Sequence, residues 1–133
     1  MKKKIEIVGI IPVKANSDRV KKKNLRKFAN TSLFELKLNQ LKKTKNFKRF
    51  VVSSEDKKIL ETAKKKGFST HYRDSYYSTS KVPMSEVYSY IASSVDATHV
   101  AWINVTNPLA GPKIYDDAAS FYKKNFNRFD SLL

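Results

Sequence analysis

The chain has 133 residues, no cysteine and only two histidines, which excludes disulfides, thiolate metal sites and histidine-rich metal sites. Its length fits one domain, and no apolar run approaches the roughly 18 residues that a membrane span needs. The 27 basic residues outnumber the 12 acidic ones, for a net charge of +15. So much positive charge predicts an anionic partner, such as a nucleotide, a nucleic acid, an acidic membrane or an acidic substrate. The alternative is a lysine-rich source proteome whose lysines only solvate the surface. We expect a cytoplasmic protein, because a chain without cysteine suits a reducing compartment. We also expect no membrane partner, since no apolar run is long enough to span a membrane.

Short β-branched segments alternate with amphipathic segments along the whole chain. The first apolar run, Ile7–Ile11, is nearly continuous, as in a strand buried on both faces of a parallel sheet. Ser32 and Glu35 have the spacing of a capping box, which predicts the start of a helix. In chain order we expect strands at 4–13, 49–54, 68–73 and 99–105, helices at 32–43, 54–67, 83–95 and 113–125, and a fifth strand beginning at 130–133.

Caps and apolar spacing predict how these helices begin, end and pack. Ser53 or Ser54 is expected to cap the second helix, and Gly67 is expected to end it. His71 and His99 flank strands, and we expect both to be structural. The packed face of the third helix is expected to carry Met84, Val87, Tyr88, Ile91 and Val95, and that of the last helix Ile114, Ala118, Phe121 and Tyr122.

This alternation predicts an α/β fold of three layers, αβα, around a mostly parallel, Rossmann-like sheet. The whole chain, 1–133, forms one domain in this interpretation. Ligands of such sheets bind beyond the carboxyl ends of the strands. That rule brings three loops to one edge of the sheet, at 13–23, 53–56 and 105–111.

The segment after the first strand is strongly basic. It supplies charge from Lys14, Arg19, Lys21, Lys22 and Lys23 and neutral donors from Asn16, Ser17 and Asn24. A loop of this kind can hold phosphate with its backbone N–H groups and its cations. The P-loop and dinucleotide fingerprints are both absent from the sequence, so the segment predicts phosphate binding without naming the ligand.

The stretch "IIPVKANSDRVKKKNL", residues 10–25, resembles the opening signature of the CMP-sugar synthetases, the acylneuraminate cytidylyltransferases and their relatives. That signature is approximately I-P-A-R-x-G-S-K-x-[IL]-x-x-K-N, and its spacing is kept by Pro12, Ser17, Lys23 and Asn24. Two later stretches, "VVSSEDKKILETAKKKG" and "WINVTNPL", are similar to later motifs of the same family. The resemblance implies the nucleotide-diphospho-sugar transferase type of sheet.

The resemblance also implies roles for particular residues. Lys14 and Lys23 would be the catalytic groups, because they would stabilise charge on the leaving pyrophosphate. Lys14 stands where the family has an arginine, and Asn104 stands where it has a glutamine. The nucleotide would be bound by Val13, Ala15, Asn16, Ser17, Arg19, Asn24, Arg73, Ser85 and Asn104.

The activity that the resemblance implies is transfer of CMP from CTP to an acidic sugar or similar acceptor, with release of pyrophosphate, for surface polysaccharide biosynthesis. Family members use Mg²⁺ and form homodimers, and they continue well past their fifth strand. Their magnesium-binding carboxylates, much of their sugar pocket and their dimerisation arm lie in that later part. We therefore expect a sheet that is incomplete at its C-terminus, magnesium ligands outside this chain, and no turnover by these 133 residues alone.

Two other classes of function compete with this interpretation. A basic nucleic-acid-binding domain would explain the net charge of +15, but the aromatic residues fall at helix-core spacings rather than on one exposed strand face. A non-catalytic remnant that binds nucleotide, or only a partner, would explain the short chain. Arg73 has an alternative too, an ion pair with Asp74 or Glu86 on the surface.

Overall fold

Four parallel strands form the central sheet of the computed structural model. Their order is β5 (Ser69–Tyr72), β4 (Arg49–Ser54), β1 (Ile7–Val13) and β6 (His99–Trp102), and every neighbouring pair is parallel. The structure describes residues 5–13, 27–28, 31–78, 81–104 and 111–125. The fifth strand expected at 130–133 lies outside these residues.

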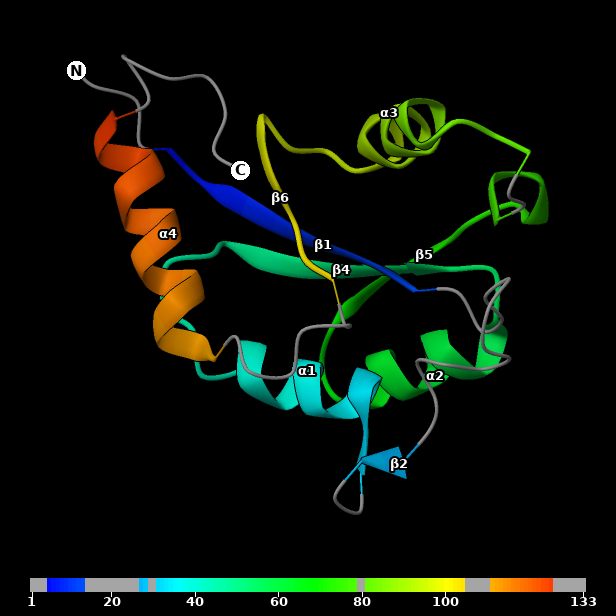
Figure 1. Cartoon of the computed structure of the whole chain (residues 1–133), viewed down its shortest axis with the longest axis horizontal. Coiled ribbons are helices and arrows are strands. Elements are labelled where there is room, and N and C mark those ends of the chain that lie inside the picture. Colours follow the sequence, from blue (N-terminus) through cyan, green and yellow to red (C-terminus); the bar gives the residue numbers. More distant parts are fainter. Residues whose placement is uncertain (1–4, 14–26, 29–30, 79–80, 105–110, 126–133) are drawn as a thin grey trace.

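Helices cover both faces of the sheet, which confirms the predicted three-layer α/β architecture (Figure 1). The alternation of side chains along β1 builds the two cores, since successive residues point to opposite faces. Ile11 and Val13 pack with α1 (Leu33–Leu41) and α2 (Lys57–Lys65), whereas Val8 and Ile10 pack beneath α3 (Met84–Ser94). The remaining elements are a short hairpin of β2 (Lys27–Phe28) and β3 (Thr31–Ser32), the 3-10 helix η2 (Ser75–Ser78), and α4 (Pro112–Asn125).

The ends of α2 follow ordinary capping chemistry. Gly67 lies just past the helix with φ of 87°, a conformation that favours glycine, so the predicted end is confirmed. The predicted cap by Ser53 or Ser54 is wrong. The N-cap is Asp56, whose carboxylate accepts from the backbone N–H groups of Lys58 and Ile59. The two serines belong to β4, which ends at Ser54 as the strand prediction had it, and both are fully buried.

On α3, the predicted packed face is largely confirmed. Val87, Ile91 and Val95 are buried in the core and Tyr88 is half-buried. Met84 is the exception, with 52% of its surface exposed, and it is the first residue of the helix.

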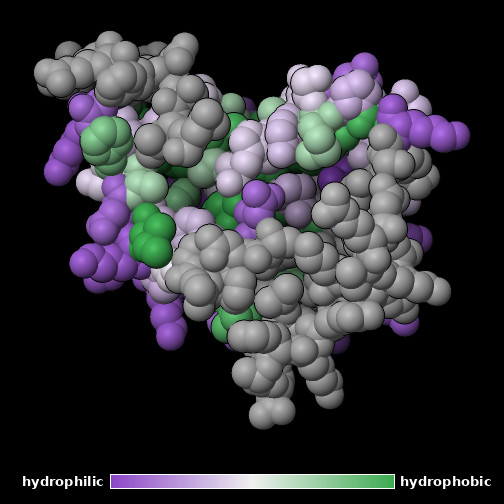
Figure 2. Space-filling model, viewed as in Figure 1, coloured by the Kyte–Doolittle hydropathy of each residue, from purple (hydrophilic) through white to green (hydrophobic). Residues whose placement is uncertain are grey.

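The predicted packed face of α4 is mostly wrong. Ile114 and Phe121 are 57% and 50% exposed, and Ala118 is exposed as well, whereas Ala119 is buried. Two half-buried tyrosines flank Ala119 on the packed side, Tyr115 and Tyr122. Figure 2 shows apolar surface among hydrophilic groups on the side of the molecule where α4 lies.

Polar contacts explain why this other face of α4 is turned inward. The Lys37 Nζ donates to the Tyr115 hydroxyl at 2.7 Å and lies 4.8 Å from the centre of its ring. The Lys37 side chain is fully buried, and burial lowers its pKa while raising that of Tyr115. The Tyr122 hydroxyl hydrogen-bonds the His99 Nδ1 at 2.9 Å. The tyrosines are therefore held by partners on α1 and β6.

Among the described residues, none of the helices is both long enough and apolar enough to cross a membrane.

Candidate functional site

The carboxyl ends of three strands meet at one edge of the sheet. In the register of the sheet, Val13 of β1 pairs with Ser54 of β4, and Ser54 pairs with Tyr72 of β5. The next residues along the chain are Glu55 after β4 and Arg73 after β5. We call this the carboxyl-end rim, the region where ligands of open parallel sheets bind.

Arg73 connects all three strand ends. Its Nη2 donates to the Val13 carbonyl at 3.0 Å and to the Glu55 Oε2 at 3.2 Å, and its backbone N–H donates to the Ser54 carbonyl at 2.9 Å. The Arg73 side chain is only 2% exposed, whereas the Glu55 side chain is 20% exposed. The Nε of Arg73 is buried and has no hydrogen-bond partner among the described residues. A buried guanidinium thus spans the base of the rim.

These contacts change the interpretation of Arg73. The predicted alternative of a surface ion pair with Asp74 or Glu86 is wrong, because Arg73 is buried and its acidic partner is Glu55. Asp56 alone caps α2, so Glu55 is not needed to start that helix. The sequence did carry a signal for this. Two adjacent acids follow β4, and a helix needs only one of them as its N-cap.

A second polar pair lies next to Arg73 on β4 and β5. The Ser53 Oγ and the His71 Nδ1 are 2.9 Å apart and hydrogen-bonded, and Ser53 is fully buried. Burial lowers the pKa of His71, and the positive charge of Arg73 lowers it further. Both effects favour the neutral form of the imidazole beside the cation.

Ser85 and Asn104 were also predicted to contact the nucleotide. Ser85 lies exposed in the first turn of α3, and Asn104 lies exposed just past β6 and the buried Ile103. No contact among the described residues joins either side chain to Arg73. The structure therefore brings together Val13 and Arg73 of the predicted set and leaves Ser85 and Asn104 apart from them.

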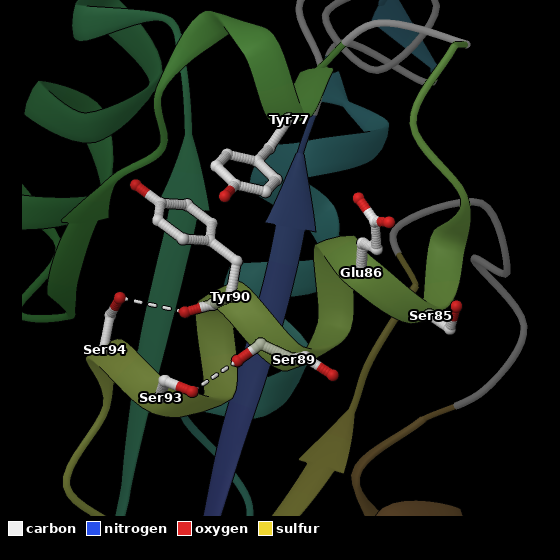
Figure 3. Close-up of a pocket in the computed structure, with 7 residues that line it drawn as sticks. All are labelled: Tyr77, Ser85, Glu86, Ser89, Tyr90, Ser93 and Ser94. Carbon is white, nitrogen blue, oxygen red and sulfur yellow. Dashed lines mark hydrogen bonds between the residues drawn. The ribbon is translucent and has the colours of Figure 1, made fainter.

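Ser85 lines an open depression of about 530 Å³ on the outer side of α3 (Figure 3). The rings of Tyr77 and Tyr90 stack there, with centroids 3.8 Å apart and planes 4° from parallel. Glu86 also lines the depression, as Figure 3 shows. The remaining lining residues are Ser89, Ser93 and Ser94. The hydroxyl of Ser93 donates to the Ser89 carbonyl, and that of Ser94 donates to the Tyr90 carbonyl.

The basic segment itself lies outside the described residues. This holds for both predicted catalytic lysines and for the other predicted nucleotide ligands of that segment, namely Lys14, Ala15, Asn16, Ser17, Arg19, Lys23 and Asn24. Their roles remain predictions. The structure does describe Val13, the last residue of β1, which directly precedes this segment in the sequence. Its carbonyl accepts a hydrogen bond from Arg73.

The described residues do not fit a metal site. They hold no group of three histidine, aspartate or glutamate side chains that could ligate an ion. At the rim, the Glu55 carboxylate pairs with Arg73 and the Asp56 carboxylate caps α2, so both already bind groups of the protein. Magnesium therefore remains a prediction from the family resemblance, as does the location of its ligands outside this chain.

Many nucleotide-binding proteins have an α/β domain with a parallel sheet, and their ligands bind at its carboxyl-end rim. Several solved structures share the α/β fold of this chain. A cytidylyltransferase from Leptospira borgpetersenii serovar Hardjo-bovis is 22% identical with a TM-score of 0.77, and 94% of this chain matches 52% of that one. CMP:2-keto-3-deoxy-manno-octonic acid synthetase, solved with CTP, is 12% identical with a TM-score of 0.75, and 90% of this chain matches 48% of it. The chain thus spans about half of these two structures.

The cytidylyltransferase family model matches residues 8–133, and the chain belongs to that family. This confirms the cytidylyltransferase part of the sequence interpretation, while membership of the acylneuraminate branch stays a proposal. Rv0371C of Mycobacterium tuberculosis, solved as a complex with manganese, is 11% identical with a TM-score of 0.66, and 90% of this chain matches 60% of that one. No curated protein sequence matches the chain.

Proposed function

We propose that this protein binds CTP and transfers CMP to an acidic sugar or a similar acceptor, with release of pyrophosphate. The observation that supports this most is the cytidylyltransferase family match over residues 8–133. The resemblance of residues 10–25 to the CMP-sugar synthetase signature supports the acidic acceptor. A role in surface polysaccharide biosynthesis and assembly as a homodimer in the cytoplasm belong to the same proposal.

In the proposed reaction an oxygen of the acceptor attacks the α-phosphorus of CTP. The bond from that phosphorus to the bridging oxygen breaks, and pyrophosphate leaves with the electron pair. The acceptor hydroxyl proton passes to solvent. Such a displacement requires positioning and charge neutralisation from the protein rather than covalent chemistry.

The basic segment would supply that neutralisation. Lys14 and Lys23 would face the charge that develops on the leaving pyrophosphate, and Arg19 would add to it. Neutral donors would orient the triphosphate, namely Ala15, Asn16, Ser17 and Asn24 through backbone N–H or side-chain groups. Ser85 and Asn104 would contact the base, the ribose or the acceptor. A divalent cation, for which the described residues offer no ligand set, would balance the triphosphate charge.

The lysines of the basic segment provide an internal test, because Lys23 matches the family signature and Lys21 falls on a variable position. Lys23→Ala is expected to weaken CTP binding by about 1.5–3 kcal/mol, the range for a hydrogen bond to a charged group. Lys21→Ala removes the same charge and is expected to weaken it little, since exposed charges are screened at physiological salt. Isothermal titration calorimetry with CTP measures both, and equal losses in the two variants would contradict the proposed site.

The acceptor class is tested by pyrophosphate release from CTP in the natural protein with magnesium present. Acidic sugars, neutral sugars and sugar phosphates are supplied in parallel. The proposal predicts release with a member of the acidic class and none with its neutral analogue. Release with sugar phosphates alone would give a CDP-linked product and would contradict the acidic-sugar assignment.

A further inference from the structure

Arg73, Glu55 and the carbonyl of Val13 form one connected unit, which we call the Arg73 clamp. A single guanidinium nitrogen, Nη2, contacts both acceptors, at 3.0 Å and 3.2 Å. The unit joins the last residue of β1 to the residues that follow β4 and β5.

Fold stability does not account for the clamp. Removing an arginine from water is costly, and a buried ion pair is often no better for stability than apolar side chains of the same volume. Arg73 is 2% exposed and also leaves its Nε without a partner among the described residues. Polar groups in this state commonly mark a site where geometry is needed for function.

The position of the clamp indicates which geometry it controls. Val13 is the last residue of β1, and the sequence continues directly into the basic segment with Lys14. A hydrogen bond to the Val13 carbonyl fixes the orientation of the peptide plane that leads into that segment. A phosphate-binding segment gains affinity when its starting geometry is fixed before the ligand arrives.

We propose that Arg73 and Glu55 are positioning residues that fix the carboxyl end of β1 and so set affinity for the triphosphate without reading the base. This inference rests on the proposed function. It replaces the expectation that Arg73 contacts base or ribose with a role through the backbone. Glu55 acts by holding the guanidinium against Val13.

Simple electrostatics predicts the opposite sign for one variant. Glu55→Gln removes a negative charge from the rim, so without a clamp the affinity for an anionic ligand should rise. The clamp predicts that affinity falls, because the guanidinium loses its charged partner. Glu6→Gln is a matched control, since Glu6 pairs with Lys48 at 3.0 Å beside the opposite end of β1.

Two ligands separate phosphate binding from base recognition, CTP and inorganic tripolyphosphate. Calorimetry measures the affinity of each protein for both ligands at about 0.15 M salt, where the Debye length is about 8 Å. The proteins are the wild type, Glu55→Gln, Arg73→Lys, the double variant and Glu6→Gln. We expect Glu55→Gln and Arg73→Lys each to weaken both ligands about tenfold. The double variant should be no weaker than either single one, and Glu6→Gln should match the wild type. Thermal unfolding of each variant identifies any loss of fold.

The outcomes distinguish the two claims. If the wild type binds neither ligand, the proposed function and the clamp both fall. If it binds CTP and Glu55→Gln binds as well or better, only the clamp is overturned. If Arg73→Lys weakens CTP but not tripolyphosphate, Arg73 reads the nucleoside and the positioning role is wrong. Should Arg73→Lys fail to fold, Glu55→Gln alone decides between these results.

Discussion

Replacement of Gly9 by alanine tests how closely the central strand packs against its neighbours. Gly9 lies in the middle of β1, paired with Phe50 of β4 and Ala101 of β6. A Cβ at this position would lie 2.5 Å from Phe50 Cδ1, 2.7 Å from Phe50 Cε1 and 3.0 Å from Ile103 Cδ1. Carbon atoms in ordinary contact are about 3.5–4.0 Å apart, so the Phe50 ring would have to move by about 1 Å.

The ring has little room for that movement. Its centre lies 5.0 Å from that of Phe47 and 6.0 Å from that of Phe68, and Phe68 is buried. Overpacking of this kind costs about 1–3 kcal/mol. Alanine recovers about 0.5–1 kcal/mol of the entropy that glycine loses in a strand. Approaches of 2.5 Å and 2.7 Å place the overpacking cost in the upper half of its range, about 2–3 kcal/mol. The expected net loss is therefore about 1–2.5 kcal/mol, which for this length lowers the melting temperature by about 4–9 °C.

Thermal and urea unfolding followed by circular dichroism measure the effect of Gly9→Ala. Gly111→Ala is the control, because a Cβ there meets no atom of the described residues within 4 Å, and it should change stability by less than about 0.5 kcal/mol. The loss at Gly9 should shrink in a Phe50→Leu background, where the clashing ring is absent. A Gly9→Ala protein as stable as the wild type would refute the packing described for this face of the sheet.

Two further predictions concern the rim and its helix. Asp56→Ala should cost about 1 kcal/mol in urea unfolding, because the N–H groups of Lys58 and Ile59 lose their acceptor, and Asp56→Asn should retain most of that stability. The pKa of His71 in the folded protein lies below the usual 6.5. Between these two pKa values the unfolded chain binds more protons than the folded one, so stability falls as the pH drops through about 6.5. His71→Gln should therefore lose less stability than the wild type between pH 7.5 and pH 5.5, and equal losses would contradict the assigned environment.

The elements that the sequence predicted well are those whose local signals and packing agree. The apolar run of β1, the β-branched β4 and the glycine-ended α2 all lie where they were predicted, within a few residues at their ends, although the N-cap of α2 is Asp56. In each of these segments the residue composition and the apolar spacing favour the same type of element, which is also the one that the tertiary structure contains.

The errors arose where two patterns competed. On α4 the apolar residues Ile114 and Phe121 predicted one face, but Tyr115 and Tyr122 carry hydroxyls whose partners, Lys37 and His99, lie far away in sequence. Periodicity weighs the apolarity of a face and cannot detect such distant partners. The two-residue strands β2 and β3 are likewise too short to show any periodicity.

The site was predictable in place but not in detail. The rule for parallel sheets predicted a rim beyond β1, β4 and β6, at 13–23, 53–56 and 105–111. The structure adds the end of β5 to that rim, because Arg73 there contacts Val13. Residues 105–110 lie outside the described residues. The pairing of Arg73 with Glu55 spans 18 positions and depends on the register between β4 and β5. A single sequence contains no measure of that register, so several acids were equally suitable partners.

The central claim is that the rim and the basic segment beyond it bind a cytidine nucleotide, and one calorimetric comparison tests it most directly. The chain is titrated with CTP, UTP, ATP and GTP at the same ionic strength and magnesium concentration. We expect CTP to bind most tightly, by at least about tenfold over UTP, which corresponds to about 1.4 kcal/mol. Equal affinity for all four nucleotides would reduce the site to a general phosphate trap, and no binding of any of them would contradict the proposed function.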